Sequence, residues 1–140
     1  MKTFLYTCAL MLMTGISACT DRDILESKPG VILPPVSNLG MEKDGEKGVI
    51  LTWDIPTSLP AEINQPVSVF IQVSEITSPT TAVPVFNTTL SDAPSTFLYE
   101  VPDAEKTYHL TVKLYAKTKN TDENYSSDIY SGGQTVVYSP

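Results

Sequence analysis

Thiols, histidine and basic side chains are scarce in this 140-residue sequence. Both cysteines, Cys8 and Cys19, lie among the first nineteen residues, so residues 20–140 offer no disulfide and no cysteine for a zinc or redox site. The single histidine, His109, has no cysteine nucleophile to activate, and no nucleophile-elbow motif is present. We therefore expect a protein that is not an enzyme and that binds no metal and no cofactor.

Basic charge is too sparse for nucleic-acid binding. The chain has 9 Lys and Arg against 16 Asp and Glu, a net charge of −7. Phosphate recognition needs a basic patch, and none is present, so nucleic acid is excluded as a partner. The acidic run Asp122-Glu123-Asn124 lacks the spaced oxygen ligands and the glycine of a calcium loop, which favours an exposed connection there.

No apolar run is long enough to span a membrane comfortably. The run Phe4–Ile16 has thirteen mostly apolar residues, follows the basic Lys2 and precedes small residues, as in a secretory signal peptide over 1–18. Its end, Ile16-Ser17-Ala18-Cys19, resembles the lipobox of bacterial lipoproteins. That resemblance implies that Cys19 receives diacylglycerol and becomes the first residue, while Cys8 leaves with the signal. A plain signal peptide cleaved near the same place stays open as the alternative.

The residues after Cys19 bear on location. Thr20, rather than aspartate, follows the cysteine, and Asp21 and Asp23 flank Arg22. By resemblance to other lipoproteins, this favours the outer membrane and somewhat favours the cell surface over a periplasm-facing orientation. Residues 19–33, with the breaker pair Pro29-Gly30, are predicted to be the lipidated cysteine and a flexible tether. Packing of its apolar residues onto the domain is the alternative.

From residue 34 to 140 no helical stripe is present and the apolar period is two. Half-buried strands are predicted where apolar and polar residues alternate, at 49–54, 67–73 and 108–116. Weaker strand signals bring the number to about seven, and eleven prolines and Asp44-Gly45 separate them. The weaker candidates are 36–42, 83–90, 96–101 and 133–138. The pattern predicts an all-β domain, an antiparallel two-sheet sandwich.

Three stretches resemble the fibronectin type III family of immunoglobulin-like domains, and the first of them, Pro34–Leu39, looks like the family's opening strand. Gly48–Pro56, with Trp53 followed by proline three residues later, is similar to the family's second strand, and Tyr108–Ala116 is similar to its sixth. The resemblance implies that Trp53 fills the centre between the sheets and that the Tyr108 hydroxyl bonds to backbone in the turn 102–107. Pro102 stands where the family usually has a leucine, with Val101 one residue earlier.

Outward aromatic residues are the candidate ligand contacts. Phe70 alternates outward on its strand, and His109 and Tyr115 do so on theirs, while Tyr125 and Tyr130 fall in the polar connection 119–130. Flat rings stack on sugars or on apolar partner surfaces. One hypothesis is therefore a lipid-anchored binding or adaptor module of the cell envelope, such as an accessory to glycan uptake, with carbohydrate or an envelope protein as partner. The other is an assembly component that adds a strand to an open sheet edge.

Overall fold

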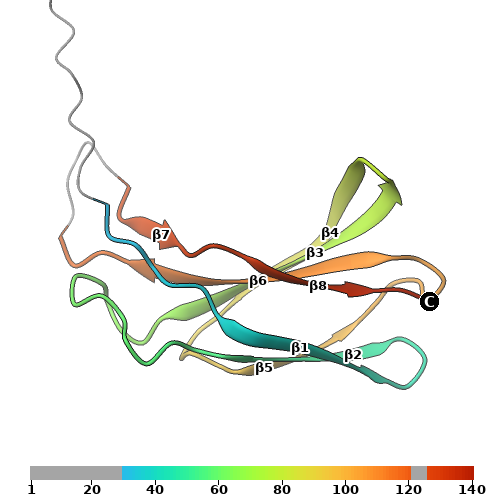
Figure 1. The fold of residues 1–140 in the computed structure, drawn as a ribbon, viewed down its shortest axis with the longest axis horizontal. Coiled ribbons are helices and arrows are strands. Elements are labelled where there is room, and N and C mark those ends of the chain that lie inside the picture. Colours follow the sequence, from blue (N-terminus) through green and yellow to red (C-terminus); the bar gives the residue numbers. More distant parts are fainter. Residues whose placement is uncertain (1–29, 121–125) are drawn as a thin grey trace, which may run out of the picture. The chain divides into compact units, whose positions relative to one another are not determined.

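The computed structural model describes residues 30–120 and 126–140, and all its regular elements are strands (Figure 1). Two antiparallel sheets are formed, one in the order β1-β2-β5 and one in the order β4-β3-β6, with β7 and β8 both pairing with β6. This is the strand order of a fibronectin type III-like sandwich and confirms the predicted all-β, two-sheet fold. The strands are β1 Ser37–Asp44, β2 Gly48–Asp54, β3 Ser68–Ser78, β4 Thr81–Leu90, β5 Thr96–Glu100, β6 Tyr108–Lys117, β7 Asp128–Tyr130 and β8 Gln134–Tyr138.

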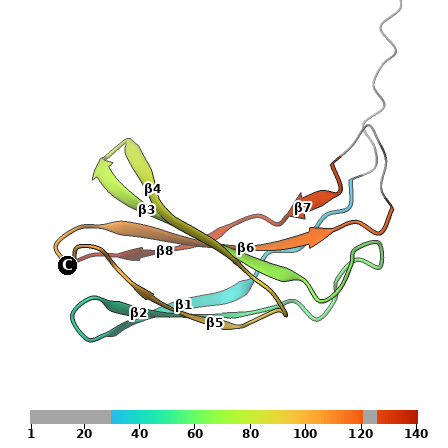
Figure 2. The same ribbon diagram turned by 180° about the vertical axis from the view of Figure 1, so that it is seen from behind.

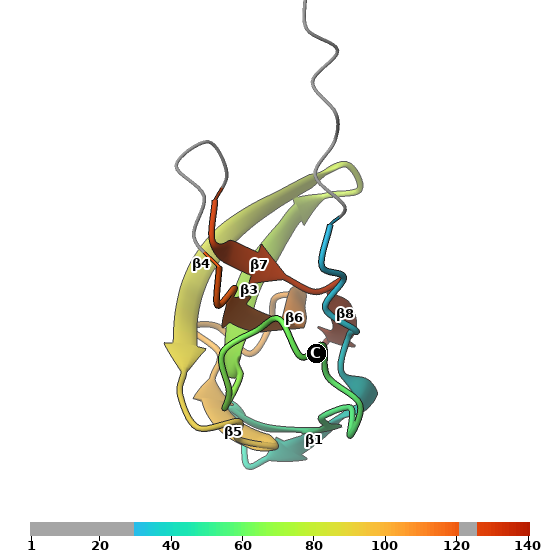
Figure 3. The same cartoon turned by 90° about the vertical axis from the view of Figure 1, so that its left-hand side faces the viewer.

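The core lies between the two sheets, which Figure 3 shows end-on as facing layers. Alternate residues of β2, β3 and β6 point into it and are almost fully buried, as the period-two pattern predicts. Because the opposite residues of the same strands face solvent, each strand has one apolar face and one polar face. The buried residues of these three strands are Val49, Leu51, Trp53, Val69, Ile71, Val73, Tyr108, Leu110, Val112, Leu114 and Ala116.

Trp53 and Tyr108 have the predicted structural positions. Trp53 is 2% exposed and Tyr108 is fully buried. The Tyr108 hydroxyl accepts a hydrogen bond from the backbone N–H of Asp103 at 3.2 Å, within the turn expected to hold it. Val101, one residue before Pro102, is 1% exposed and takes part in the core.

The compact unit begins before the expected domain boundary. Val31–Pro140 form one unit by their contacts, Leu33 is 3% exposed within the core, and Val31 packs against it. The flexible segment predicted up to residue 33 was therefore too long at this end, because burying Leu33 outweighs leaving it in solvent. Since residues 31–140 supply their own closed core, they meet the requirement for a domain that folds alone.

The described residues form eight strands, against about seven predicted. The last strand is interrupted at Ser131–Gly133 and forms two short strands, β7 and β8, along the same side of β6. Tyr130, expected in a loop, therefore lies on a sheet. Tyr125 lies outside the described residues, as do Cys8, Cys19 and the run 122–124.

Candidate functional site

Three aromatic side chains meet on the outer face of the five-stranded sheet. Tyr130 on β7 is directly paired with Tyr115 on β6, and their ring centroids are 5.0 Å apart. Phe70 on β3 meets the Tyr130 ring edge-on, with centroids 5.8 Å apart. Phe70, Tyr115 and Tyr130 are named here the aromatic cluster. Edge-to-face and tilted contacts at these distances are favourable ring geometries, so the cluster is a packed surface rather than three separate side chains.

The aromatic cluster remains accessible to a partner. Tyr130 is 53% exposed, and Phe70 and Tyr115 are half-buried. About half of Tyr130 is therefore accessible, while the rings of Phe70 and Tyr115 pack against it. A ring supported in this way loses little conformational freedom when a flat ligand stacks on it.

Charged groups border one side of the cluster. The Tyr115 hydroxyl donates a hydrogen bond to Asp128 Oδ1 at 2.9 Å, and Lys117 Nζ lies 3.9 Å from the same oxygen. The hydrogen bond to the Asp128 carboxylate, together with burial, raises the pKa of Tyr115 above its usual value. Tyr115 thus stays a neutral phenol whose hydroxyl is oriented toward the Asp128 carboxylate.

A one-residue bulge places Tyr130 in the cluster. Val112 pairs with Gln134, and Tyr115 pairs with Tyr130. The two paired positions are three residues apart on β6 but four residues apart on the opposite chain segment, which therefore contains one extra residue. Without the extra residue, Tyr130 would lie opposite Ala116 and face the core, because side chains alternate with period two. The bulge reverses that orientation and brings the ring to the outer face.

Ser131 and Gly133 hold the bulge. Ser131 is 6% exposed, and its Oγ accepts a hydrogen bond from the Leu114 N–H at 2.8 Å while its own N–H donates to the Leu114 carbonyl at 2.9 Å. The backbone groups that the bulge displaces are therefore still satisfied. At Gly133 a Cβ atom would come within 2.8 Å of Thr111 Cγ2, so glycine alone allows this approach.

The other sequence-predicted contacts do not join the cluster. His109 lies on the same outer face, opposite Ser74 and Val137, but six residues from Tyr115 along β6, or about 20 Å. His109 therefore shares the outer face with Tyr115, as alternation predicts, but the two side chains are not neighbours. Tyr125 is not among the described residues.

A second aromatic group was not predicted. Phe86 on β4 packs against Phe97 and Tyr99 on β5, with centroids 6.2 Å and 4.9 Å away, where the two sheets approach each other. Burial raises the pKa of Tyr99. The sequence contained one indication of this group: Phe97 and Tyr99 are two residues apart in the predicted strand 96–101, so they share one face of it. All three are partly buried, so they extend the core and do not form a ligand platform.

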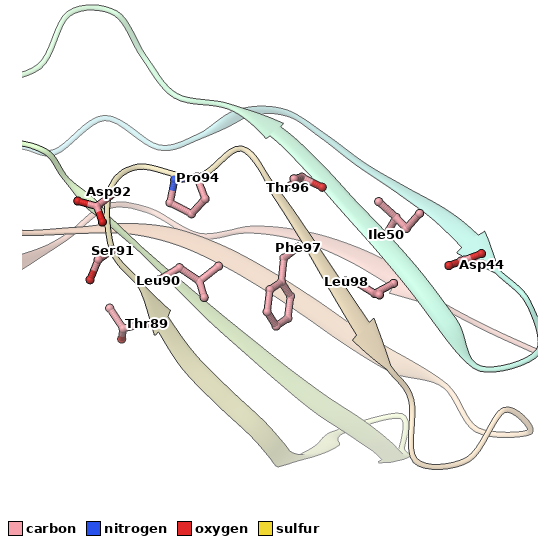
Figure 4. A pocket seen from close by; sticks show the side chains of 10 residues that line it. All are labelled: Asp44, Ile50, Thr89, Leu90, Ser91, Asp92, Pro94, Thr96, Phe97 and Leu98. Atoms are coloured by element: carbon pink, nitrogen blue, oxygen red, sulfur yellow. The ribbon is translucent and has the colours of Figure 1, made fainter.

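An open depression runs beside β5, with Phe97 and Leu98 among its lining residues and Asp92 and Asp44 at opposite ends (Figure 4). Apolar side chains supply most of its surface, with no cluster of polar groups directed at one point. Within the described residues, no three His, Cys, Asp or Glu side chains converge on a possible metal site. No helix in that part of the chain has the length and apolarity needed to cross a membrane. The aromatic cluster is therefore the best candidate site.

The sheet order and the corner tyrosine define a fibronectin type III-like β-sandwich domain. The chain belongs to the family described as domain of unknown function DUF4945, whose model matches residues 19–138. No curated protein matches it.

Two similar solved structures are also β-sandwiches. One comes from a computer-based redesign of a β-sandwich protein; it is 15% identical, covers 76% of this chain and 89% of its own, and has a TM-score of 0.49. The other is the fibronectin type III domain of human fibronectin type III domain containing protein 3, at 17% identity, 82% and 93% coverage and a TM-score of 0.46.

Proposed function

We propose that this protein is a lipid-anchored, non-catalytic binding module of the bacterial outer membrane, facing the cell surface. The observation that carries the binding role is the aromatic cluster, a supported and accessible tyrosine ring on an otherwise polar sheet face. Stacking on the apolar face of a sugar ring is the interaction that suits it best. A glycan at the cell surface is therefore the proposed ligand class, and delivery to a glycan uptake system is the proposed context.

The anchoring role is supported by the sequence alone. Ile16-Ser17-Ala18-Cys19 supplies the lipobox pattern, and two or three acyl chains hold a protein stably because each buried methylene contributes about 0.8 kcal/mol. The acidic chain would be repelled by anionic headgroups, so the lipid rather than the protein surface would hold it at the membrane.

A glycan array with residues 31–140 tests the binding role. Tyr130→Ala removes the exposed ring, and we expect a two- to tenfold loss of affinity, equivalent to about 0.5–1.5 kcal/mol for an aromatic contact. Tyr130→Phe should bind like the unchanged protein. Leu98→Ala, at a 59% exposed residue of the other sheet, is the matched control and should also leave binding unchanged. Binding that survives Tyr130→Ala, or no glycan bound at all, would contradict the proposal.

Palmitate labelling in cells tests the anchor separately. Cys19→Ser should abolish labelling of the full chain, whereas Cys8→Ser should leave the mature protein labelled. Labelling that persists in Cys19→Ser would show that the lipid is attached elsewhere. Surface proteolysis of intact cells then reports which side of the outer membrane the domain occupies.

A further inference from the structure

The hairpin between β3 and β4 forms an arm that extends beyond the body of the sandwich. Figures 1 and 2 show its turn leaving the other strands of both sheets. Thr81–Val85 at the start of β4 are all exposed, including Val83 at 45% and Val85 at 41%. We name residues 76–85 the β3–β4 arm. Exposed valines there have no role in the core of this domain.

The arm ends in an unpaired sheet edge. β4 is ten residues long, is the terminal strand of its sheet and pairs with β3 alone among the described strands. An edge of this length presents a row of unpaired N–H and C=O groups that another strand can join. Natural edge strands usually carry charged residues that discourage such pairing. β4 has no charged residue, and the features that discourage pairing are confined to Pro84 and to the adjacent bulge at Val85, where the register with β3 shifts.

Charge distinguishes this edge from the others. Residues 76–91 contain no charged side chain, although the chain as a whole has a net charge of −7. The edge strands β1, β5 and β7 carry carboxylates at Glu42, Glu100 and Asp128, and β8 lies against β1. Two copies of an acidic protein repel each other at most surfaces, and like charges brought together at an interface cost several kcal/mol. Pairing of two copies at the arm would avoid that cost.

We propose that the β3–β4 arm is a self-association surface, at which β4 of one copy pairs antiparallel with β4 of a second copy. The same strand serves both sides, so the interface is two-fold symmetric and closes at a dimer. The five-stranded sheets of the two copies become one continuous sheet. The extension of the arm from the sandwich keeps the two acidic bodies apart while the edges pair. This association is independent of the aromatic cluster and of any ligand.

Analytical ultracentrifugation of residues 31–140 over a concentration series tests the dimer. Val83→Lys and Val85→Lys each place a positive charge on the paired edge, close to the equivalent lysine of the second copy. Because the two lysines repel each other, we expect each variant to raise the dimer dissociation constant at least tenfold. Val137→Lys is the matched control: the same change at a 50% exposed valine on β8 should alter that constant less than twofold. A monomer at all concentrations up to about 1 mM, or equal weakening by Val137→Lys, would overturn the proposal.

Two measurements on the unchanged protein keep the test independent of the variants. Amide hydrogen exchange should slow with rising concentration only at those residues of β4 whose N–H groups point away from β3. Added salt should strengthen the dimer, because it screens repulsion between two acidic copies. A dimer that weakens in salt, or that protects other amides instead, would mean that oppositely charged faces hold the copies together and that strand pairing is wrong.

Discussion

At the scale of single residues, Trp53 is the largest side chain in the core. Its ring is buried between the sheets, and truncation to alanine at such a site costs about 3–5 kcal/mol. Domains are typically stable by about 5–15 kcal/mol, so Trp53→Ala should leave the domain marginal. Urea unfolding followed by circular dichroism measures this loss.

The indole nitrogen makes Trp53→Phe an informative comparison. Trp53 Nε1 is buried without a hydrogen-bond partner in the described structure, so phenylalanine loses no hydrogen bond and leaves only a smaller cavity. We expect Trp53→Phe to cost clearly less than Trp53→Ala. Equal costs in urea unfolding would show that Nε1 has a partner, such as a buried water, that stabilises the fold.

The Tyr115 hydroxyl gives a pH prediction. Its pKa is raised by the hydrogen bond to Asp128 and by burial, so folding favours the neutral phenol. The resulting stabilisation is fully present below the unfolded-state pKa of about 10 and is lost as the pH rises through the higher folded-state pKa. In Asp128→Asn the Tyr115 pKa should fall, which spectrophotometric titration of tyrosine detects. Glu42→Gln, on the other sheet, should leave the titration unchanged.

At the scale of elements, the bulge after β7 controls which residues reach the outer face. Deleting Gly132 removes the extra residue and should turn Tyr130 toward Ala116 and the core. Gly132→Ala should leave the bulge intact, because nothing lies within 4 Å of a Cβ atom built there. Nuclear Overhauser contacts between the Phe70 and Tyr130 rings report the difference. Their survival in the deletion variant would contradict the register argument.

Sequence periodicity predicted the strands that alternate strongly and missed the element that depends on pairing. β2, β3 and β6 alternate over seven residues or more, which identifies both the strand and its buried face. β7 has only three residues, and one extra residue before β8 decides which of its side chains point to the outer face of the sheet. No periodicity along a single strand reveals that offset, because it exists only relative to β6. Phe70 and Tyr115 were thus predicted on one face, whereas the position of Tyr130 required the structure.

Two further features could not be predicted from periodicity: the distance between His109 and Tyr115, and the burial of Leu33. Alternation assigned His109 to the outer face correctly, yet distance along β6 separates it from Tyr115. Leu33 precedes the first strand and belongs to no repeating pattern, so its burial depends on contacts that the sequence does not reveal. Isolated apolar residues beside a predicted strand are the positions at which domain boundaries are easily misplaced.

At the scale of the whole molecule, Val31–Pro140 should unfold as one cooperative unit. Removing residues 31–33 takes Leu33 out of the core, and burial of a leucine contributes about 1.5–3 kcal/mol. We therefore expect residues 34–140 to fold with lower stability than residues 31–140 in urea unfolding. Leu33→Ala in the longer form should reproduce most of the loss. Equal stability of the two forms would mean that the boundary lies at residue 34.

The position of β7 makes the two ends of the domain different. β7 lies at the end of the sandwich where residues 31–36 enter, and the β3–β4 turn lies at the opposite end (Figures 1 and 2). A ligand on the aromatic cluster and a second copy paired at the β3–β4 arm would therefore occupy opposite ends of the domain, so neither would block the other.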